Sequence, residues 1–193
     1  MPQPSIQFDK RQLDLVKKTF SEIKNGAPRV IVRSLNKTAA KAKTEASKEI
    51  RKVVTLKAKT VKDAIKITKP NFKNLSAKLT ISGRPLPLIN YGLAKNIFVK
   101  GGGLGARAGI KVKVRKNRGI EKHPNAFFAQ MKSGHKGIYE RKGKKRLPIE
   151  EKAGPSIPAV FQFNGESKVS LNAANNLQTN LDREIAFLLS KIK

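Results

Sequence analysis

Few residues in this sequence have the types and spacing that catalysis or metal binding requires. The 193 residues include no Cys and only two histidines, His123 and His135, and neither histidine belongs to a recognisable motif. A nucleophilic mechanism needs a base next to its nucleophile, and no such arrangement is visible. The 13 acidic residues are too scattered for a glycosidase pair or a two-metal site. We therefore expect no enzyme activity, no metal site and no cofactor.

The glycine-rich stretch at residues 101–109, GGGLGARAG, differs from known nucleotide-binding loops. A Walker loop ends in Gly-Lys followed by Ser or Thr, and a dinucleotide fingerprint lies between a strand and a helix. This stretch carries Arg107 instead and leads into a predicted strand. One interpretation is a flexible loop. The other is a basic loop that follows a phosphate backbone, because glycine imposes few steric limits.

The excess of positive charge is the strongest chemical signal in the sequence. The chain has 42 Lys and Arg residues against 13 Asp and Glu, which gives a net charge of +29 at neutral pH. A compact domain with this charge repels itself, so the excess indicates a polyanionic partner or an assembly that tolerates the field. No acid occurs between Ala64 and Ile120, and residues 141–146 form a second basic cluster. One lysine run alone is typical of a solvated face, but two clusters favour a surface that faces phosphates.

The sequence lacks the motifs that read nucleic-acid bases. It has no zinc-finger spacing, no basic region joined to heptads and no aromatic RNA-recognition motif. Aromatic residues make up 6% of the chain and Trp is absent, so platforms for base stacking are scarce. Contacts with a nucleic acid should therefore be made to phosphates and be indifferent to base sequence.

Helices are predicted at both ends of the chain. A first helix runs from Asp9 to a stop at Gly26, with apolar residues at helical spacing: Leu13, Val16, Phe20 and Ile23. A longer helix begins near Pro28, and its apolar stripe is Ile31, Leu35, Ala39, Ala42, Ala46 and Ile50. The small residues of this stripe would let another helix or a sheet approach closely. A short helix is expected at residues 60–65, and the last helix carries the stripe Ala174, Leu177, Leu181, Ile185, Leu188 and Ile192.

The middle of the chain changes to the two-residue period of strands. Residues 77–82 alternate between apolar and polar, residues 86–91 are expected to run back beside them, and residues 97–100 are a short candidate strand. One later strand is cationic on one face, because Ile110, Val112 and Val114 alternate with Lys111, Lys113 and Arg115.

A hairpin and an edge strand complete the predicted sheet. Residues 126–131 and 137–141 form the hairpin, residues 146–150 contain Pro148 and so belong at an edge, and residues 154–158 are a linker. The fold class is α+β, with N-terminal helices, a central antiparallel sheet that carries the glycine-rich basic loop, and a C-terminal helix. We divide one domain into a helical region at 1–70, a sheet region at 71–165 and a helix at 166–193.

Four segments late in the sequence follow one another in a recognisable order. They are NAFFAQMKSG at residues 125–134, an aromatic-bearing segment at 137–141 that ends in Arg, RLPI at 146–149 and GPSIPAVF at 154–161. With the Ala- and Lys-rich helix before them and a terminal helix after them, they resemble the minor tail protein Z family of tailed bacteriophages. The resemblance covers most of the chain, and residues 126–161 are its specific part.

The resemblance implies a structural virion protein that completes the head-proximal end of the tail after assembly in the host cytoplasm. It implies a six-fold ring that sits on the tail terminator, faces the head connector and surrounds the double-stranded DNA. The residues expected to face DNA are Arg107, Lys111, Lys113, Arg115, Lys116, Arg118, Lys142, Lys144 and Lys145. The residues expected to contact other subunits or partners are Leu13, Val16, Phe20, Leu181, Ile185 and Leu188. No membrane partner is expected, because the sequence has no run of about 18 apolar residues.

A nonspecific nucleic-acid-binding protein of ribosomal or chromosome-organising type would explain the charge equally well. The pattern at residues 126–161 favours the tail protein. A salt-sensitive complex with free DNA or RNA in the absence of tail proteins would favour the alternative.

Overall fold

The computed structural model describes residues 5–6, 10–19, 26–92, 95–98 and 107–190. Its helices are α1 (Lys10–Thr19), α2 (Gly26–Val53), α3 (Ala58–Asp63), the 3-10 helix η1 (Leu88–Asn90), α4 (Ile157–Asn164) and α5 (Glu166–Leu189). Its strands are β1 (Ser5–Ile6), β2 (Ile65–Thr68), β3 (Ala77–Ile81), β4 (Lys95–Phe98), β5 (Arg107–Val112), β6 (Glu121–His123), β7 (Ala126–Gln130), β8 (Lys136–Arg141) and β9 (Ile149–Glu151). The predicted α+β class is confirmed, and these strands form three antiparallel sheets, in the orders β1-β3-β2, β4-β5-β6 and β7-β8-β9.

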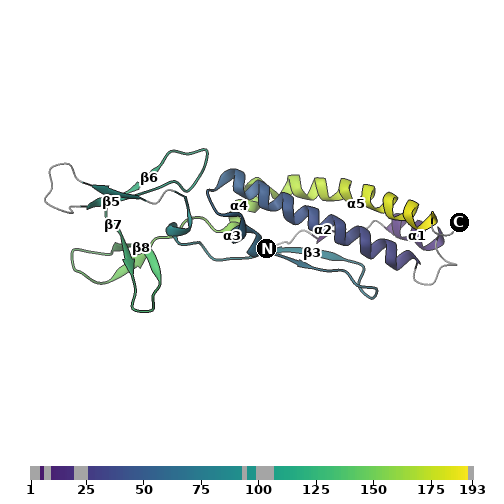
Figure 1. The fold of residues 1–193 in the computed structure, drawn as a ribbon, viewed down its shortest axis with the longest axis horizontal. Coiled ribbons are helices and arrows are strands. Elements are labelled where there is room, and N and C mark those ends of the chain that lie inside the picture. The colour runs from purple at the N-terminus through teal and green to yellow at the C-terminus, as the bar shows by residue number, and fades with distance from the viewer. Residues whose placement is uncertain (1–4, 7–9, 20–25, 93–94, 99–106, 191–193) are drawn as a thin grey trace.

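The two long helices α2 and α5 lie side by side and form most of the helical end of the molecule (Figure 1). All six residues of the predicted α2 stripe, from Ile31 to Ile50, are buried. Polar groups also join the pair: the Asn180 amide donates to the Thr38 hydroxyl at 2.9 Å, and the Ser34 hydroxyl donates to the Asn180 carbonyl at 3.3 Å. The small side chains of the stripe permit this close approach, since their Cβ atoms leave room for the neighbouring backbone.

The β4-β5-β6 and β7-β8-β9 sheets lie at the opposite end of the elongated molecule (Figure 1). The end of α2 holds the first of these sheets through backbone hydrogen bonds, in which Thr55 N donates to Val114 O at 3.1 Å and Lys116 N donates to Val53 O at 2.8 Å. The buried Tyr91 ties the region before β4 to the region after β9, because its hydroxyl donates to the Pro155 carbonyl at 2.7 Å. The helical end and the two sheets are therefore joined at several points along the sequence.

Some local predictions were wrong for identifiable reasons. The short helix predicted at 60–65 is present as α3, and only its end was placed too late. Strand β2 begins at Ile65, and its Ile65 and Ile67 are β-branched and pair with β3. Residues 86–91 form η1 and one isolated bridge, because Pro85 and Pro87 lack the N–H groups that a paired strand needs. The linker predicted at 154–158 runs into α4, whose first turn is capped by the Ser156 hydroxyl accepting from Ala159 N at 3.4 Å.

Candidate nucleic-acid interface

A cationic strand face lies on β5 and on the residues that follow it. Ile110, Val112 and Val114 are buried, which confirms the predicted apolar side. Lys111, Lys113 and Arg115 alternate with them and are partly exposed. Because successive side chains of an extended strand point to opposite faces, these three cations share the other side.

The pairing of β5 with β6 adds a further lysine to this face, because Lys122 of β6 lies directly opposite Lys111. On the other edge of β5, the backbone register pairs Lys111 with Lys95 of β4. Like charges directly opposite each other destabilise a sheet. Within the described ranges, no ion pair joins Lys111, Lys113, Arg115 or Lys122 to a carboxylate. We call these four residues the basic strand face.

The helical end fixes the position of the basic strand face. Lys113 N donates to the Gly92 carbonyl at 3.2 Å, and the Thr55 hydroxyl donates to the Lys113 carbonyl. Arg115 forms a backbone bridge with Val54 at the end of α2. The backbone that carries these cations is therefore held on both sides. A backbone held in this way suits repeated contact with a charged polymer.

A second basic site is a groove beside the β7–β8 hairpin, with a volume of about 540 Å³. Arg141 lies over the Phe127 ring, with its guanidinium carbon 4.7 Å from the ring centre. Asn125, Lys142 and Lys144 also line the groove. Stacking on an aromatic ring leaves the edge of a guanidinium available to donate hydrogen bonds, so the groove can accept a phosphate oxygen.

The remaining DNA-facing candidates lie in turns or at strand ends. Lys116 and Arg118 are exposed in the turn after the basic strand face. Lys142, Lys144 and Lys145 are exposed in the connection between β8 and β9, and the Lys142 ammonium lies 3.4 Å from a Glu150 carboxylate oxygen. Arg107 is the first residue of β5, and its side chain and residues 101–106 lie outside the described part. The structure thus brings Lys111, Lys113 and Arg115 together on one face and Lys142 and Lys144 into the groove.

The two histidines occupy different environments. His135 is exposed, and its Nε2 lies 2.7 Å from a Glu151 carboxylate oxygen. His123 is partly buried, and its Nε2 has no hydrogen-bond partner among the described residues. Nearby, a hydrogen bond from Lys152 to Glu140 at 2.7 Å lowers the pKa of that carboxyl. The described part of the chain contains no group of three or more His, Cys, Asp or Glu that could hold a metal ion.

The side chains predicted to contact partners mostly pack inside the chain. Val16, Leu181 and Leu188 are buried in the hydrophobic core, and Ile185 packs against it. The side chain of Leu13 and all of Phe20 lie outside the described part. Contact with another subunit through the buried residues would require this core to open. The exposed large apolar residues of α5 are instead Leu171, Phe187 and Leu189.

Two features of the interface were missed in the sequence. Lys122 was not predicted to face DNA, although it alternates along the sequence with Glu121 and His123. The reason is that β6 has only three residues and no apolar pattern that would identify it as a strand. The Arg141–Phe127 stack was also missed, and the predicted hairpin gave a signal for it, since the two strands that carry these residues pair antiparallel. Both features depend on which strands become neighbours.

Comparison with known proteins gives one match. A family model described as prophage minor tail protein Z (GPZ) matches residues 13–192. Neither the curated proteins nor the solved structures contain a match to this chain. No helix in the described part is both long enough and apolar enough to span a membrane.

Proposed function

The chain belongs to the prophage minor tail protein Z family, and from this membership we propose that it completes the head-proximal end of the tail and joins it to the head connector. Membership makes it a structural protein of a bacteriophage tail and places it in the virion. The finer proposal is a six-fold ring of copies on the tail terminator, around the path of the DNA.

In this proposal the ring holds double-stranded DNA through phosphates and does not read bases. The observation that carries it is the basic strand face, where Lys111 and Lys122 lie directly opposite each other without a neutralising carboxylate in the described part. A duplex would supply that negative charge and remove the repulsion between the lysines. With a net charge of +29 on each copy, a ring would line its channel with a strong positive potential.

The groove beside the β7–β8 hairpin extends the same proposal. The Arg141 guanidinium lies over the Phe127 ring, and Lys144 also lines the groove. These groups can hold one phosphate at a fixed position while the basic strand face contacts others. Such contacts position the DNA and carry no sequence information.

Neutralising the basic strand face should weaken DNA binding by roughly a thousandfold at 100 mM NaCl. The slope of log affinity against log salt concentration should become shallower by about 3 to 4, because each phosphate contact contributes about 0.9 to that slope. The variant combines four substitutions: Lys111→Gln, Lys113→Gln, Arg115→Gln and Lys122→Gln. The affinity for a 20-bp duplex is measured between 50 and 200 mM NaCl with the full chain. Two duplexes of unrelated sequence should bind equally.

A control variant removes the same charge elsewhere: Lys17→Gln, Lys48→Gln, Lys59→Gln and Lys62→Gln. All four lysines are exposed, on helices α1, α2 and α3. We expect this control to change the salt slope by less than half as much. An equal loss in both variants would mean that net charge alone binds DNA, and an unchanged slope in the first variant would contradict the proposed interface.

A further inference from the structure

Helices α4 and α5 carry almost none of the positive charge of this chain. Residues 153–190, which contain both helices, include two basic residues, Lys168 and Arg183, although the whole chain has 42. Glu166, Asp182 and Glu184 lie in the same stretch and give it a net charge of −1. The positive charge of the molecule therefore lies almost wholly outside these two helices.

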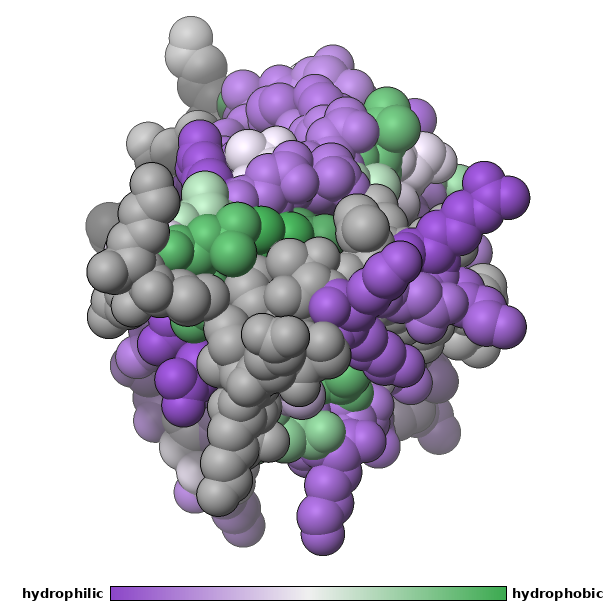
Figure 2. Space-filling view, turned by 90° about the vertical axis from the view of Figure 1, so that its right-hand side faces the viewer, coloured by the Kyte–Doolittle hydropathy of each residue, from purple (hydrophilic) through white to green (hydrophobic). Residues whose placement is uncertain are grey.

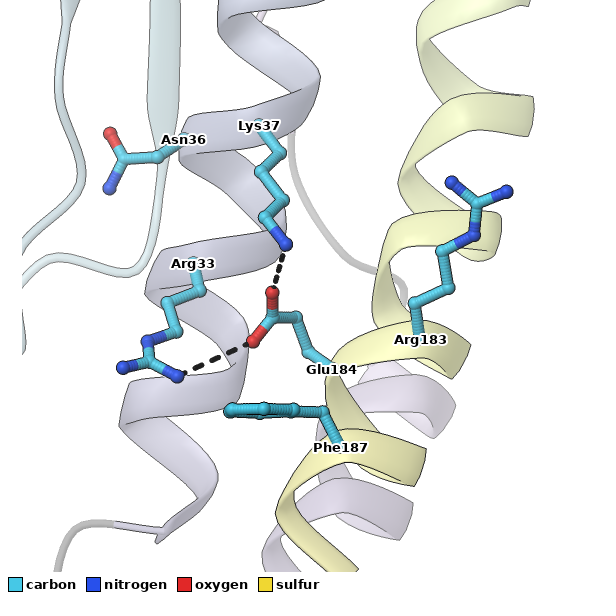
Figure 3. A pocket seen from close by; sticks show the side chains of 6 residues that line it. All are labelled: Arg33, Asn36, Lys37, Arg183, Glu184 and Phe187. Atoms are coloured by element: carbon cyan, nitrogen blue, oxygen red, sulfur yellow. Dashed lines mark hydrogen bonds and ion pairs between the residues drawn. The ribbon is translucent and has the colours of Figure 1, made fainter. Parts of the chain in front are cut away.

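Several charges of α5 are engaged by α2. Glu184 is 5% exposed, accepts a hydrogen bond from Lys37 and lies 3.7 Å from Arg33 (Figure 3). At the other end of α5, the Lys168 ammonium lies 3.3 Å from a Glu49 carboxylate oxygen. These ion pairs join the two helices to each other, so they add little charge to the side of α5 that faces away from α2.

That side of α5 carries a row of exposed, uncharged residues. The row repeats at helical spacing and consists of Leu171, Ala174, Gln178 and Leu189. The helix buries a different stripe in the core, made of Ala173, Leu177, Leu181 and Leu188. Asp182 borders the exposed row and accepts a hydrogen bond from Gln178 at 3.1 Å. Helix α5 lies along one edge of the helical end, with α2 beside it (Figure 1).

Large apolar side chains project from this part of the molecule. Phe163, near the end of α4, is 83% exposed, and Leu171 is 65% exposed. Figure 2, which faces the end of the molecule where α5 ends, also shows hydrophobic residues exposed among hydrophilic ones. Aromatic residues and a lack of charge are typical of the centre of a protein–protein interface. We call Phe163 and the exposed row of α5 the neutral helical surface.

The distribution of charge indicates which partner fits this surface. Two copies of a chain with a net charge of +29 repel each other wherever their lysines and arginines meet. An acidic partner would be attracted to the basic surfaces and would not need a neutral one. A partner that is itself strongly cationic needs a surface without that charge, and a second copy of this chain is such a partner.

We propose that copies of this chain contact one another through the neutral helical surface, with Phe163 and Leu171 buried in the contact. The proposal deepens the ring proposed above, and it rests on that ring for the presence of several copies. It does not use contact with DNA. The basic strand face belongs to β5 and β6, so this contact leaves it available for the duplex.

The test measures self-association of the full chain by sedimentation velocity at 10 to 500 µM protein. We expect association with a dissociation constant on the order of 100 µM in 500 mM NaCl. Association should be at least fivefold weaker in 50 mM NaCl, because the Debye length is then about 14 Å instead of about 4 Å and the copies repel more strongly. Salt weakens DNA binding, so the two contacts respond to salt in opposite directions.

The variant Phe163→Gln with Leu171→Gln should weaken self-association at least tenfold. Both side chains are exposed, so the variant should keep the thermal stability of the native chain. The matched control is Phe72→Gln with Leu147→Gln, which removes two apolar side chains that are 59% and 65% exposed but lie next to basic residues in the sequence. The control should associate within twofold of the native chain.

Three results would overturn the proposal. The chain could remain monomeric at 500 µM in 500 mM NaCl, which would leave the neutral helical surface to a different protein. Association could weaken as salt is added, which would mean that charges make the contact. The control could lose as much association as the variant, which would place the contact elsewhere or spread it over any exposed apolar residue.

The same proteins separate this proposal from the proposed DNA contact. The variant of Phe163 and Leu171 should bind a 20-bp duplex as the native chain does, and the fourfold variant of the basic strand face should self-associate at least as strongly as the native chain. Loss of self-association in the fourfold variant would show that the basic strand face itself joins the copies, which contradicts the assignment of that contact to α4 and α5.

Discussion

Replacing Gly109 by Ala should destabilise the β4-β5-β6 sheet by about 3 kcal/mol or more. Gly109 has φ +113°, a conformation that residues with a side chain rarely adopt. A Cβ atom there would overlap the His123 carbonyl oxygen and lie 2.5 Å from the Pro124 carbonyl oxygen. These are backbone atoms of the paired strand and its turn, so they cannot rotate away. Urea unfolding measures the loss, and amide exchange at Ile110 and Val112 locates it.

The matched control is Gly119→Ala, in the connection between β5 and β6. A Cβ atom at Gly119 would meet nothing within 4 Å, and we expect a change within about 0.5 kcal/mol. If Gly109→Ala were as stable as this control, β5 and β6 would not pair as described. Since that pairing brings Lys122 opposite Lys111, Lys122 would then no longer belong to the basic strand face.

Raising the pH from 10 to 12 should lower the free energy of unfolding of the native chain by about 2 kcal/mol more than that of a Tyr91→Phe variant. Burial raises the pKa of Tyr91 to about 12, against an ordinary value of about 10. The folded chain therefore keeps a proton that the unfolded chain releases. The stabilisation is complete below pH 10 and is lost as the pH rises through 12. The physical cause is that an ionised Tyr91 is poorly solvated and can no longer donate to the Pro155 carbonyl.

The measurement is the free energy of unfolding of both proteins at pH 8, 10, 11 and 12. At pH 8 the variant should be less stable by about 1 kcal/mol, because it lacks the hydrogen bond. The difference should shrink and then change sign as the pH rises. Lysines also titrate in this range, but both proteins carry the same lysines. Parallel curves would show that Tyr91 is exposed to water and that the junction between the two ends is open.

The sequence predicted those features of the fold that depend on local periodicity. The α2 stripe from Ile31 to Ile50 repeats every three or four residues, and one helix face therefore had to be apolar. The same reasoning found the alternation of Ile110 and Lys111 and the β7–β8 hairpin. In each case the residues that identify the element lie within a few positions of one another.

Features that depend on distant partners could not be predicted in this way. The C-terminal stripe was expected to include Ala174, but Ala173 is the buried residue. Glu184 lies on the buried face between Leu181 and Leu188, where a local pattern calls for an apolar side chain. Its charge is tolerated because Lys37 of α2, far away in the sequence, reaches it. The same limit applies to Lys122, which joins the interface only through strand pairing.

The most direct test of the central claim is a reconstruction of the phage particle at a resolution that traces side chains. We expect copies of this chain in a ring at the head-proximal end of the tail. In that ring Lys111, Lys113, Arg115 and Lys122 should point into the channel, within reach of the DNA phosphates. A chain that lay away from the path of the DNA, or a ring whose inner wall was formed by acidic residues, would contradict the proposed role.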